Sequence, residues 1–359
     1  MATRNPAHIG NNFDFLRLAA AMCVLFSHQF VLSGQAEPLV LGVRTLGGLG
    51  VLIFFSISGY LVAASWRADP SVTRFALRRL LRIWPGFAVA VLMCAFVFAP
   101  TVATLPLHEY LHDPRLPYYV KNNLMFALRE GLPIDFAGSR YPAAIDGSLW
   151  TIPLELECYV AVAVLGVVGL LRRRGVVLSG LLLGLVAYAV VQPRGESLVA
   201  DFQWLKENQY LLEFGLFFFA GTSIQLFEWA RPEAPRWRML AACWVIAVFA
   251  YALGRPLLAL WLVVPLTTLM IGVRSTPWIC RLGVIGDLSF GVYIYAFPVQ
   301  QMMVHFVLPR IGWWPTLMLT TGASLLLALA SWHLIEKRAL WLKPRRRARA
   351  MAAVVEPGR

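Results

Sequence analysis

Charged residues are scarce in this sequence, and acidic residues are the scarcest of them. Only 14% of the 359 residues are charged, whereas 59% are hydrophobic, and the mean hydropathy is +0.65. This composition is too apolar for an ordinary soluble globule and predicts a polytopic membrane protein. The 32 Lys and Arg against 19 Asp and Glu leave a net charge of +13, so either nucleic-acid binding or membrane topology has to explain the basic excess.

Cysteine is also rare, and no CxxC pair occurs. The five cysteines stand apart, in apolar runs or in a predicted loop, so we expect neither a disulfide framework nor a metal site. We expect no cleaved leader, because Met1–Asn12 is polar and the first apolar run is a full span. Nor do we find an internal repeat of the kind that inverted-repeat transporters carry.

Ten apolar runs predict an all-α protein with about ten membrane spans. They cover about 13–34, 47–66, 84–104, 149–171, 176–192, 208–229, 239–253, 257–273, 287–308 and 315–336. With the N-terminus inside, 22 of the 32 Lys and Arg fall in inner segments and nine in outer ones. The positive-inside rule then predicts cytoplasmic N- and C-termini and explains the net charge without nucleic acid. We expect 1–336 to form one transmembrane domain, and 337–359 to form a basic cytoplasmic tail near anionic lipid.

The longest outer segment runs from Leu105 to Ser148. It is rich in proline and aromatic residues and contains the acidic residues Glu109, Asp113, Glu130, Asp135 and Asp146. A loop of this length without strong periodicity is usually either functional or disordered. Here it could cover the outer mouth of a site.

Two basic residues lie inside the first span, where ionisable groups are costly and usually functional. Arg17 and His28 are eleven residues apart, which places them within about 20° of one helix face and roughly 16 Å apart along the axis. Glu155 of the fourth span shares the depth of His28, so the two form a candidate base and orienting carboxylate. The alternatives are a packing histidine and an ion pair of Arg17 with Asp14, one turn earlier.

A row of arginines precedes the third span in RFALRRLLRIWP. Arg74, Arg78 and Arg82 recur every four residues on one helix face, and Pro85 is predicted to mark the turn into the membrane. Guanidinium groups in this pattern suit a polyphosphate or nucleotide at the cytoplasmic surface. Anionic lipid and the positive-inside rule are the alternative explanations.

Small and polar residues interrupt two other spans. They are Ser56, Ser58 and Gly59 in GGLGVLIFFSISGYLVAASW, and Ser289, Tyr293 and Tyr295 in GDLSFGVYIYAFPVQQ. Small residues serve tight helix packing or a narrow acyl path, and we expect Pro298 to interrupt its helix where it lines a cavity. In the last span, His333 and Glu336 are expected to anchor the helix at the inner interface.

Together these segments resemble acyltransferase family 3, which comprises membrane O-acyltransferases such as bacterial glycan O-acetylases. FDFLRLAAAMCVLFSH resembles its Arg-x10-His first helix, GVLIFFSISGYL its FF-x-x-SG-Y element, and RFALRRLLRIWP its Arg-rich segment before the third helix. LWTIPLELECY resembles its W-S/T-L-x-x-E-x-x-x-Y segment, and LSFGVYIYAFP and SWHLIEK resemble its closing elements. The match covers nearly the whole chain in order. Ala296 and Arg338 depart from it, because many members have His and Pro there.

The resemblance implies transfer of an acyl group, by default acetyl, from cytoplasmic acyl-CoA to a hydroxyl of a cell-envelope carbohydrate or lipid-linked saccharide. It implies acyl-CoA (acetyl-CoA) as co-substrate with no bound cofactor or metal, a bacterial inner-membrane location and no nucleic-acid partner. The catalytic residues would be His28 and Glu155, and the donor-binding residues Arg17, Arg74, Arg78, Arg79 and Arg82. The pocket or path would contain Asp14, Ser56, Ser58, Gly59, Tyr60, Trp150, Ser289, Tyr293 and Tyr295.

Two functions from other classes compete with this prediction. A proton-coupled exporter or permease would use His28 and Glu155 as an intramembrane proton relay. A non-catalytic membrane scaffold would tolerate substitution of both residues. Reconstituted vesicles separate enzyme from permease, because only the enzyme consumes labelled acetyl-CoA and labels a glycan.

Overall fold

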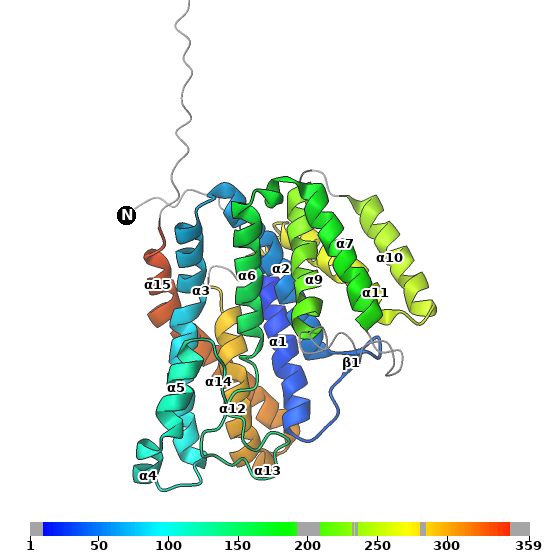
Figure 1. The fold of residues 1–359 in the computed structure, drawn as a ribbon. Coiled ribbons are helices and arrows are strands. Elements are labelled where there is room, and N and C mark those ends of the chain that lie inside the picture. The colour runs from blue at the N-terminus through cyan, green and yellow to red at the C-terminus, as the bar shows by residue number, and fades with distance from the viewer. Residues whose placement is uncertain (1–9, 192–208, 232, 234–235, 281–284, 345–359) are drawn as a thin grey trace, which may run out of the picture.

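The computed structural model describes residues 10–191, 209–231, 233, 236–280 and 285–344, which form a bundle of helices joined by loops (Figure 1). Each of the ten predicted apolar runs overlaps one long helix. These helices are α1 (Phe13–Leu32), α2 (Leu46–Ala68), α3 (Val72–Met93), α6 (Thr151–Val167), α7 (Arg174–Val191), α9 (Gln209–Phe227), α10 (Trp237–Ala252), α11 (Pro256–Gly272), α12 (Ser289–Phe306) and α14 (Trp313–Ser331).

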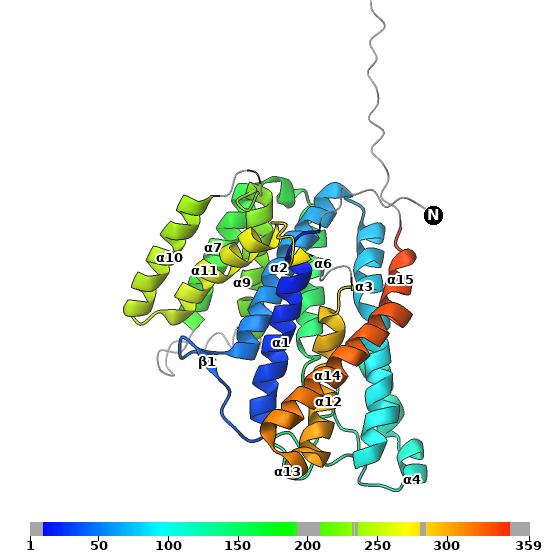
Figure 2. The same ribbon diagram turned by 180° about the vertical axis from the view of Figure 1, so that it is seen from behind.

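Five helical segments in the described part of the chain are long and apolar enough to cross a bilayer. They are Phe13–Leu32, Leu46–Ala68, Val72–Val102, Gln209–Phe227 and Trp313–Trp341. The start of α1 and the end of α15 (Lys337–Trp341) lie at the same end of the bundle (Figures 1 and 2), as an even number of crossings requires. Ten crossings and cytoplasmic termini stay predictions.

Helix α2 is the centre of the bundle because its small residues let two neighbours approach closely. A Cβ added to Gly50 would lie 2.5 Å from the carbonyl oxygen of Ala20 in α1, and one added to Gly59 would lie 1.8 Å from that of Phe218 in α9. From the α9 side, a Cβ on Gly221 would lie 2.1 Å from the carbonyl oxygen of Ser56. Backbone contacts this close require glycine and fix α2 between α1 and α9.

Two helices continue through prolines at which the sequence predicts a turn or a break. Pro85 lies inside α3 and Pro298 inside α12, and both helices are continuous there. The predictions of a turn at Pro85 and of a broken ninth span are therefore wrong. The physical reason is that helices buried among others tolerate proline, since neighbouring groups compensate for the lost hydrogen bond. Helix α3 extends further through a π-helical turn (Cys94–Phe98) and a 3-10 turn (Ala99–Val102).

Short elements fill segments that the sequence leaves irregular. A two-stranded antiparallel hairpin, β1 (Leu39–Val40) and β2 (Arg44–Thr45), makes a small exception to the all-α prediction. The long outer segment contains α4 (Leu107–His112) and α5 (Arg115–Leu124), and α13 (Leu308–Ile311) precedes α14. Helix α14 crosses obliquely over α12 (Figure 2) and continues through a π-helical turn into α15. Part of the predicted tail is therefore helical, while 345–359 lie outside the described residues.

Candidate active site

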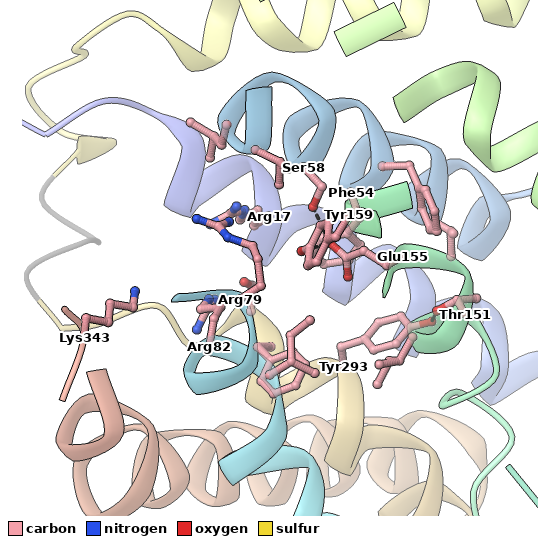
Figure 3. Close-up of a pocket in the computed structure, with 18 residues that line it drawn as sticks. Arg17, Phe54, Ser58, Arg79, Arg82, Thr151, Glu155, Tyr159, Tyr293 and Lys343 are labelled. Atoms are coloured by element: carbon pink, nitrogen blue, oxygen red, sulfur yellow. Dashed lines mark hydrogen bonds between the residues drawn. The ribbon is translucent and has the colours of Figure 1, made fainter. Parts of the chain in front are cut away.

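One cavity, of about 250 Å³, lies between α1, α2, α3, α6 and α12. Arg17, Arg79, Arg82 and Lys343 gather at one end of it, with Glu155 farther in (Figure 3). We call it the basic cavity. It draws residues from six places in the chain that are far apart in sequence, so only the folded bundle assembles it.

Acidic side chains neutralise part of this positive charge. Asp287, just before α12, accepts hydrogen bonds from Arg17 (3.3 Å) and Arg82, and the buried Glu336 accepts one from Arg82 (3.3 Å). Neighbouring cations and burial lower the pKa of Lys343 to about 8, and burial is the larger cause. Because Lys343 is still largely protonated at neutral pH, the cavity contains four cations. The carboxylates near them are Glu155 in the lining and, beside it, Asp287 and Glu336.

Arg79 differs from Arg17 and Arg82 because it forms no ion pair within the described residues. Its only hydrogen bond among the described residues is to Ser65 Oγ, at 3.3 Å, and its guanidinium carbon lies 5.8 Å from the ring centre of Tyr159. Its buried Nε has no partner there. A guanidinium group held in place and not neutralised is suited to bind a phosphate.

Glu155 is held by hydroxyl groups. Its Oε1 accepts hydrogen bonds from Ser58 of α2 and from Tyr159, one turn further along α6, at 2.6 Å (Figure 3). Glu155 therefore lies in the basic cavity, fixed from two helices.

A second cavity, of about 750 Å³, contains His28. We call it the histidine cavity. Its wall is built by α1, α2, α5, α6, α9 and α12, by Glu37, by β2 and by residues of the long outer segment between 128 and 149. That this segment covers the outer mouth of a site stays a prediction. The His28 ring packs edge-on against Phe297, with ring centres 5.2 Å apart, and its buried Nδ1 has no partner in the described chain.

The two cavities share part of their walls. Val51, Thr151 and Tyr293 line both of them. The Tyr293 hydroxyl donates to the carbonyl oxygen of Ser148 at 2.9 Å and lies 2.6 Å from Thr151 Oγ1. Because Tyr293 has a single hydroxyl proton, Thr151 is the donor in the second bond. This hydroxyl pair stands between the cationic end of one cavity and the imidazole of the other.

Two arginines predicted to bind the donor lie outside the basic cavity. Arg74 and Arg78 both donate to Asp69, which directly follows α2, at 2.5–2.8 Å. Hydrogen bonds from Arg74 and Arg78 hold the pKa of Asp69 well below its usual value. These bonds tie the start of α3 to the end of α2, and donor binding by Arg74 and Arg78 stays a prediction.

The predicted hydrogen bond between His28 and Glu155 is not formed. Glu155 turns toward Ser58 in the basic cavity, and His28 turns toward Phe297 in the histidine cavity. Equal depth in the bundle does not fix the direction in which a side chain points. The direct relay that the exporter alternative requires is therefore missing from the described residues.

The predicted path residues divide into two groups. Ser58 and Ser289 line the basic cavity, Trp150 lines the histidine cavity and Tyr293 lines both. Asp14, Ser56, Gly59, Tyr60 and Tyr295 line neither. The Ser56 hydroxyl donates to the carbonyl oxygen of Leu52 (2.8 Å), and the Tyr295 hydroxyl donates to Ser331 Oγ (3.4 Å). Ser56 and Tyr295 are therefore bonded within the helix bundle.

Lys343, Thr151 and Asp146 line the cavities without an assigned role in the sequence prediction. Asp287 and Glu336 lie outside both linings and pair with the cavity arginines. Glu336 is predicted to anchor the last helix, and instead is buried against Arg82. Asp146 directly precedes the GSLW stretch of the fourth-span motif, and this proximity is the signal that could have separated it from the other acidic residues of its loop.

A family model described as an acyltransferase domain matches residues 11–333. The chain belongs to acyltransferase family 3. The match includes every helix that lines the two cavities, so both cavities are parts of an acyltransferase, and the protein is an enzyme of that class.

Curated relatives support the same family. An O-acetyl transferase of Shigella phage Sf6 is 32% identical, with 93% of this chain and 97% of the relative aligned. Nodulation protein 10 of Rhizobium leguminosarum bv. viciae is 26% identical, with 93% and 94% aligned. Acyltransferase MdmB of Streptomyces mycarofaciens is 36% identical over 26% of this chain and 24% of its own. No solved structure matches this acyltransferase.

Proposed function

We propose that the protein is an O-acetyltransferase that moves an acetyl group from cytoplasmic acetyl-CoA to a hydroxyl of a cell-envelope carbohydrate or lipid-linked saccharide. The name of the phage relative, which aligns over nearly its full length, supports O-acetyl transfer. The observation that carries the proposal is that a cationic cavity and a histidine cavity share one wall, at Val51, Thr151 and Tyr293.

The basic cavity suits the donor. CoA carries phosphate groups at one end and a thioester at the other, joined by a flexible arm. Arg79 and Lys343, helped by Arg17 and Arg82, would bind the phosphates. At about 250 Å³ the cavity is small, so it suits the arm and the acetyl group, while the nucleotide would remain at its mouth. The thioester would then lie near Thr151 and Tyr293.

The histidine cavity suits the acceptor. His28 would remove the proton of the acceptor hydroxyl as its oxygen bonds to the thioester carbonyl carbon. The carbon–sulfur bond then breaks, and the CoA thiolate takes the proton from His28 as it leaves toward the basic cavity. The products are the acetyl ester and free CoA, and His28 returns to its starting state. The unpaired Nδ1 of His28 supports this role, because no protein group in the described chain occupies it.

The membrane arrangement belongs to the proposal. Inner segments carry most of the arginines and lysines, and this bias favours a bacterial inner membrane location with both termini in the cytoplasm. The basic cavity contains Arg17 near the start of α1 and Lys343 after α15, both near the end of the bundle where the predicted inner segments lie. Donor and acceptor would thus approach from opposite sides.

Reconstitution tests the proposal. The purified chain in lipid vesicles receives acetyl-CoA labelled on the acetyl group, with de-O-acetylated surface polysaccharide from cells lacking the gene as acceptor. We expect label in the polysaccharide and stoichiometric release of CoA. Label that stays in acetyl-CoA, or solute transport that proceeds without CoA, would contradict it.

A further inference from the structure

Asp146 lines the histidine cavity, and one of its carboxylate oxygens has no partner among the described residues. It lies in the segment between α5 and α6, and its Oδ1 accepts hydrogen bonds from the backbone N–H of Ser148 (2.9 Å) and from Ser148 Oγ (2.6 Å). Its Oδ2 is buried and has no partner within the described residues. One oxygen therefore fixes the carboxylate in position, and the other has no partner in the described part of the chain.

A buried oxygen of this kind is costly unless a ligand satisfies it. Burial raises the pKa of Asp146 to about 7, although the bonds from Ser148 act in the opposite direction. The other charged or basic side chains that line the cavity are His28, Glu37, Arg44, Arg129 and Glu130. Arg44 is paired with Glu213 through a terminal nitrogen, although its Nε has no partner in the described chain, and Glu37 accepts a bond from Ser27.

Asp146 and His28 are connected through one aromatic ring. The His28 ring packs on Phe297, and a Cβ added to Gly147 would lie only 2.6 Å from the same ring. The backbone next to Asp146 therefore lies directly against Phe297. The lining of this cavity thus includes three polar atoms without protein partners in the described chain, Nδ1 of His28, Oδ2 of Asp146 and Nε of Arg44.

An aromatic surface in the same cavity suits a sugar ring. Trp150 and Tyr210 line it with ring centres 5.0 Å apart, and 43% and 45% of their surfaces are exposed. Apolar ring faces beside a few fixed polar groups are typical of small-molecule sites, and the volume of about 750 Å³ lies in their usual range. A carbohydrate combines hydroxyl donors with an apolar C–H face.

We infer that Asp146 is a further substrate-binding residue, whose Oδ2 accepts a hydrogen bond from a hydroxyl of the carbohydrate beside the one that reacts at His28. This inference rests on the proposed function. It requires an acceptor with two adjacent hydroxyls. His28 deprotonates one of them, and the other only donates a hydrogen bond to Asp146. It also gives Asp146 a role in choosing which hydroxyl reacts, because the second bond fixes the ring's orientation.

The test is steady-state transfer by the full chain in vesicles, with acetyl-CoA and the de-O-acetylated polysaccharide varied separately. Asp146→Asn keeps an oxygen for Ser148 and replaces the accepting Oδ2 by an N–H donor. We expect the KM for polysaccharide to rise tenfold or more, since bonds to charged groups have that magnitude. The KM for acetyl-CoA should stay within about twofold. Asp135→Asn, an exposed residue of the same segment that lines neither cavity, should change neither value.

The outcomes separate the two hypotheses. If the wild-type chain transfers no label, the proposed function fails and this inference with it. If the wild type transfers label and Asp146→Asn keeps the parental KM for polysaccharide, only the inference is overturned. Should Asp146→Asn not fold, Asp146→Glu decides, because it keeps the charge and moves the oxygen by one methylene. An unchanged KM for polysaccharide in that variant would overturn the inference equally.

Discussion

The Tyr293 hydroxyl lies 2.6 Å from Thr151 Oγ1, and this contact separates the basic cavity from the histidine cavity. Tyr293 belongs to α12, and Thr151 is the first residue of α6. The Tyr293 hydroxyl also donates a hydrogen bond to the carbonyl oxygen of Ser148. We expect a thioester that passes from one cavity to the other to pass this contact. We expect the hydroxyl pair to control when the thioester reaches the acceptor, and to keep water away from the thioester.

Tyr293→Phe should uncouple the reaction. The variant keeps the ring and loses the hydroxyl that bonds Ser148 and Thr151, so the wall between the cavities loosens. We expect acetyl-CoA hydrolysis without acceptor to increase severalfold relative to acetyl transfer, with a loss of stability of about 1 kcal/mol. The ratio of CoA released to acetyl ester formed measures this. A ratio that remains at one would argue against a separating role.

His28→Ala should abolish transfer and leave the fold intact. The imidazole donates to no described group through Nδ1, and its known contact is the edge of Phe297. Removing a general base lowers rates by about 10²–10⁴-fold. His305→Ala is the matched control, because His305 lies on α12, packs on Phe136 and lines neither cavity. Equal activity of the two variants would remove His28 from the mechanism.

Arg79→Ala and Arg74→Ala should differ, although both residues lie on α3. Arg79 faces the basic cavity with little compensation, whereas Arg74 is paired with Asp69. We expect Arg79→Ala to raise the KM for acetyl-CoA about tenfold or more, the magnitude of a charged hydrogen bond. Arg74→Ala should leave that KM unchanged and lower the melting temperature slightly. The reverse pattern would place the donor at the Asp69 cluster.

Gly59→Ala should disrupt the bundle. The added methyl group would lie 1.8 Å from the carbonyl oxygen of Phe218, so α2 and α9 would have to separate. Overpacking of this kind costs about 1–3 kcal/mol or more. Gly215→Ala on α9 is the control, since its added Cβ meets nothing within 4 Å. Similar melting temperatures for the two variants would contradict the close α2–α9 contact.

Asp146→Asn should stabilise the protein in neutral and alkaline solution. The carboxyl pKa is raised from its ordinary value near 4 to about 7 in the folded state. Proton binding therefore favours the folded state in full below pH 4, and this contribution is lost as the pH rises through 7. Asparagine cannot ionise, so the melting temperature of the variant relative to wild type should increase between about pH 5 and pH 8. A difference that does not vary with pH would contradict the burial of this charge.

The first helix shows how far the sequence could carry the prediction. The eleven-residue spacing predicts Arg17 and His28 on one stripe near opposite ends of α1, and the structure places one in the basic cavity and the other in the histidine cavity. Helical geometry alone gives this result. The pairing of His28 with Glu155 failed because depth along an axis says nothing about rotation of the second helix, which turns Glu155 toward Ser58.

The arginines before the third span do not share one environment, for a related reason. A four-residue period groups Arg74, Arg78 and Arg82, but the face toward the cavity contains Arg79 and Arg82. Which face of α3 meets the cavity depends on its neighbours, and Asp69 captures the other arginines at the preceding turn. Lys343 reaches the cavity, and Glu336 reaches Arg82 of α3, from a segment remote in sequence, so local patterns contain no sign of either arrangement.

The common wall of the two cavities also has a pharmacological consequence. Because Thr151 and Tyr293 belong to both linings, a single elongated compound could span them, with an anionic head among the arginines, a thioether in place of the thioester and a sugar ring beside His28. Such a bisubstrate inhibitor would gain from linkage itself, since the second half binds at a high effective concentration once the first is bound.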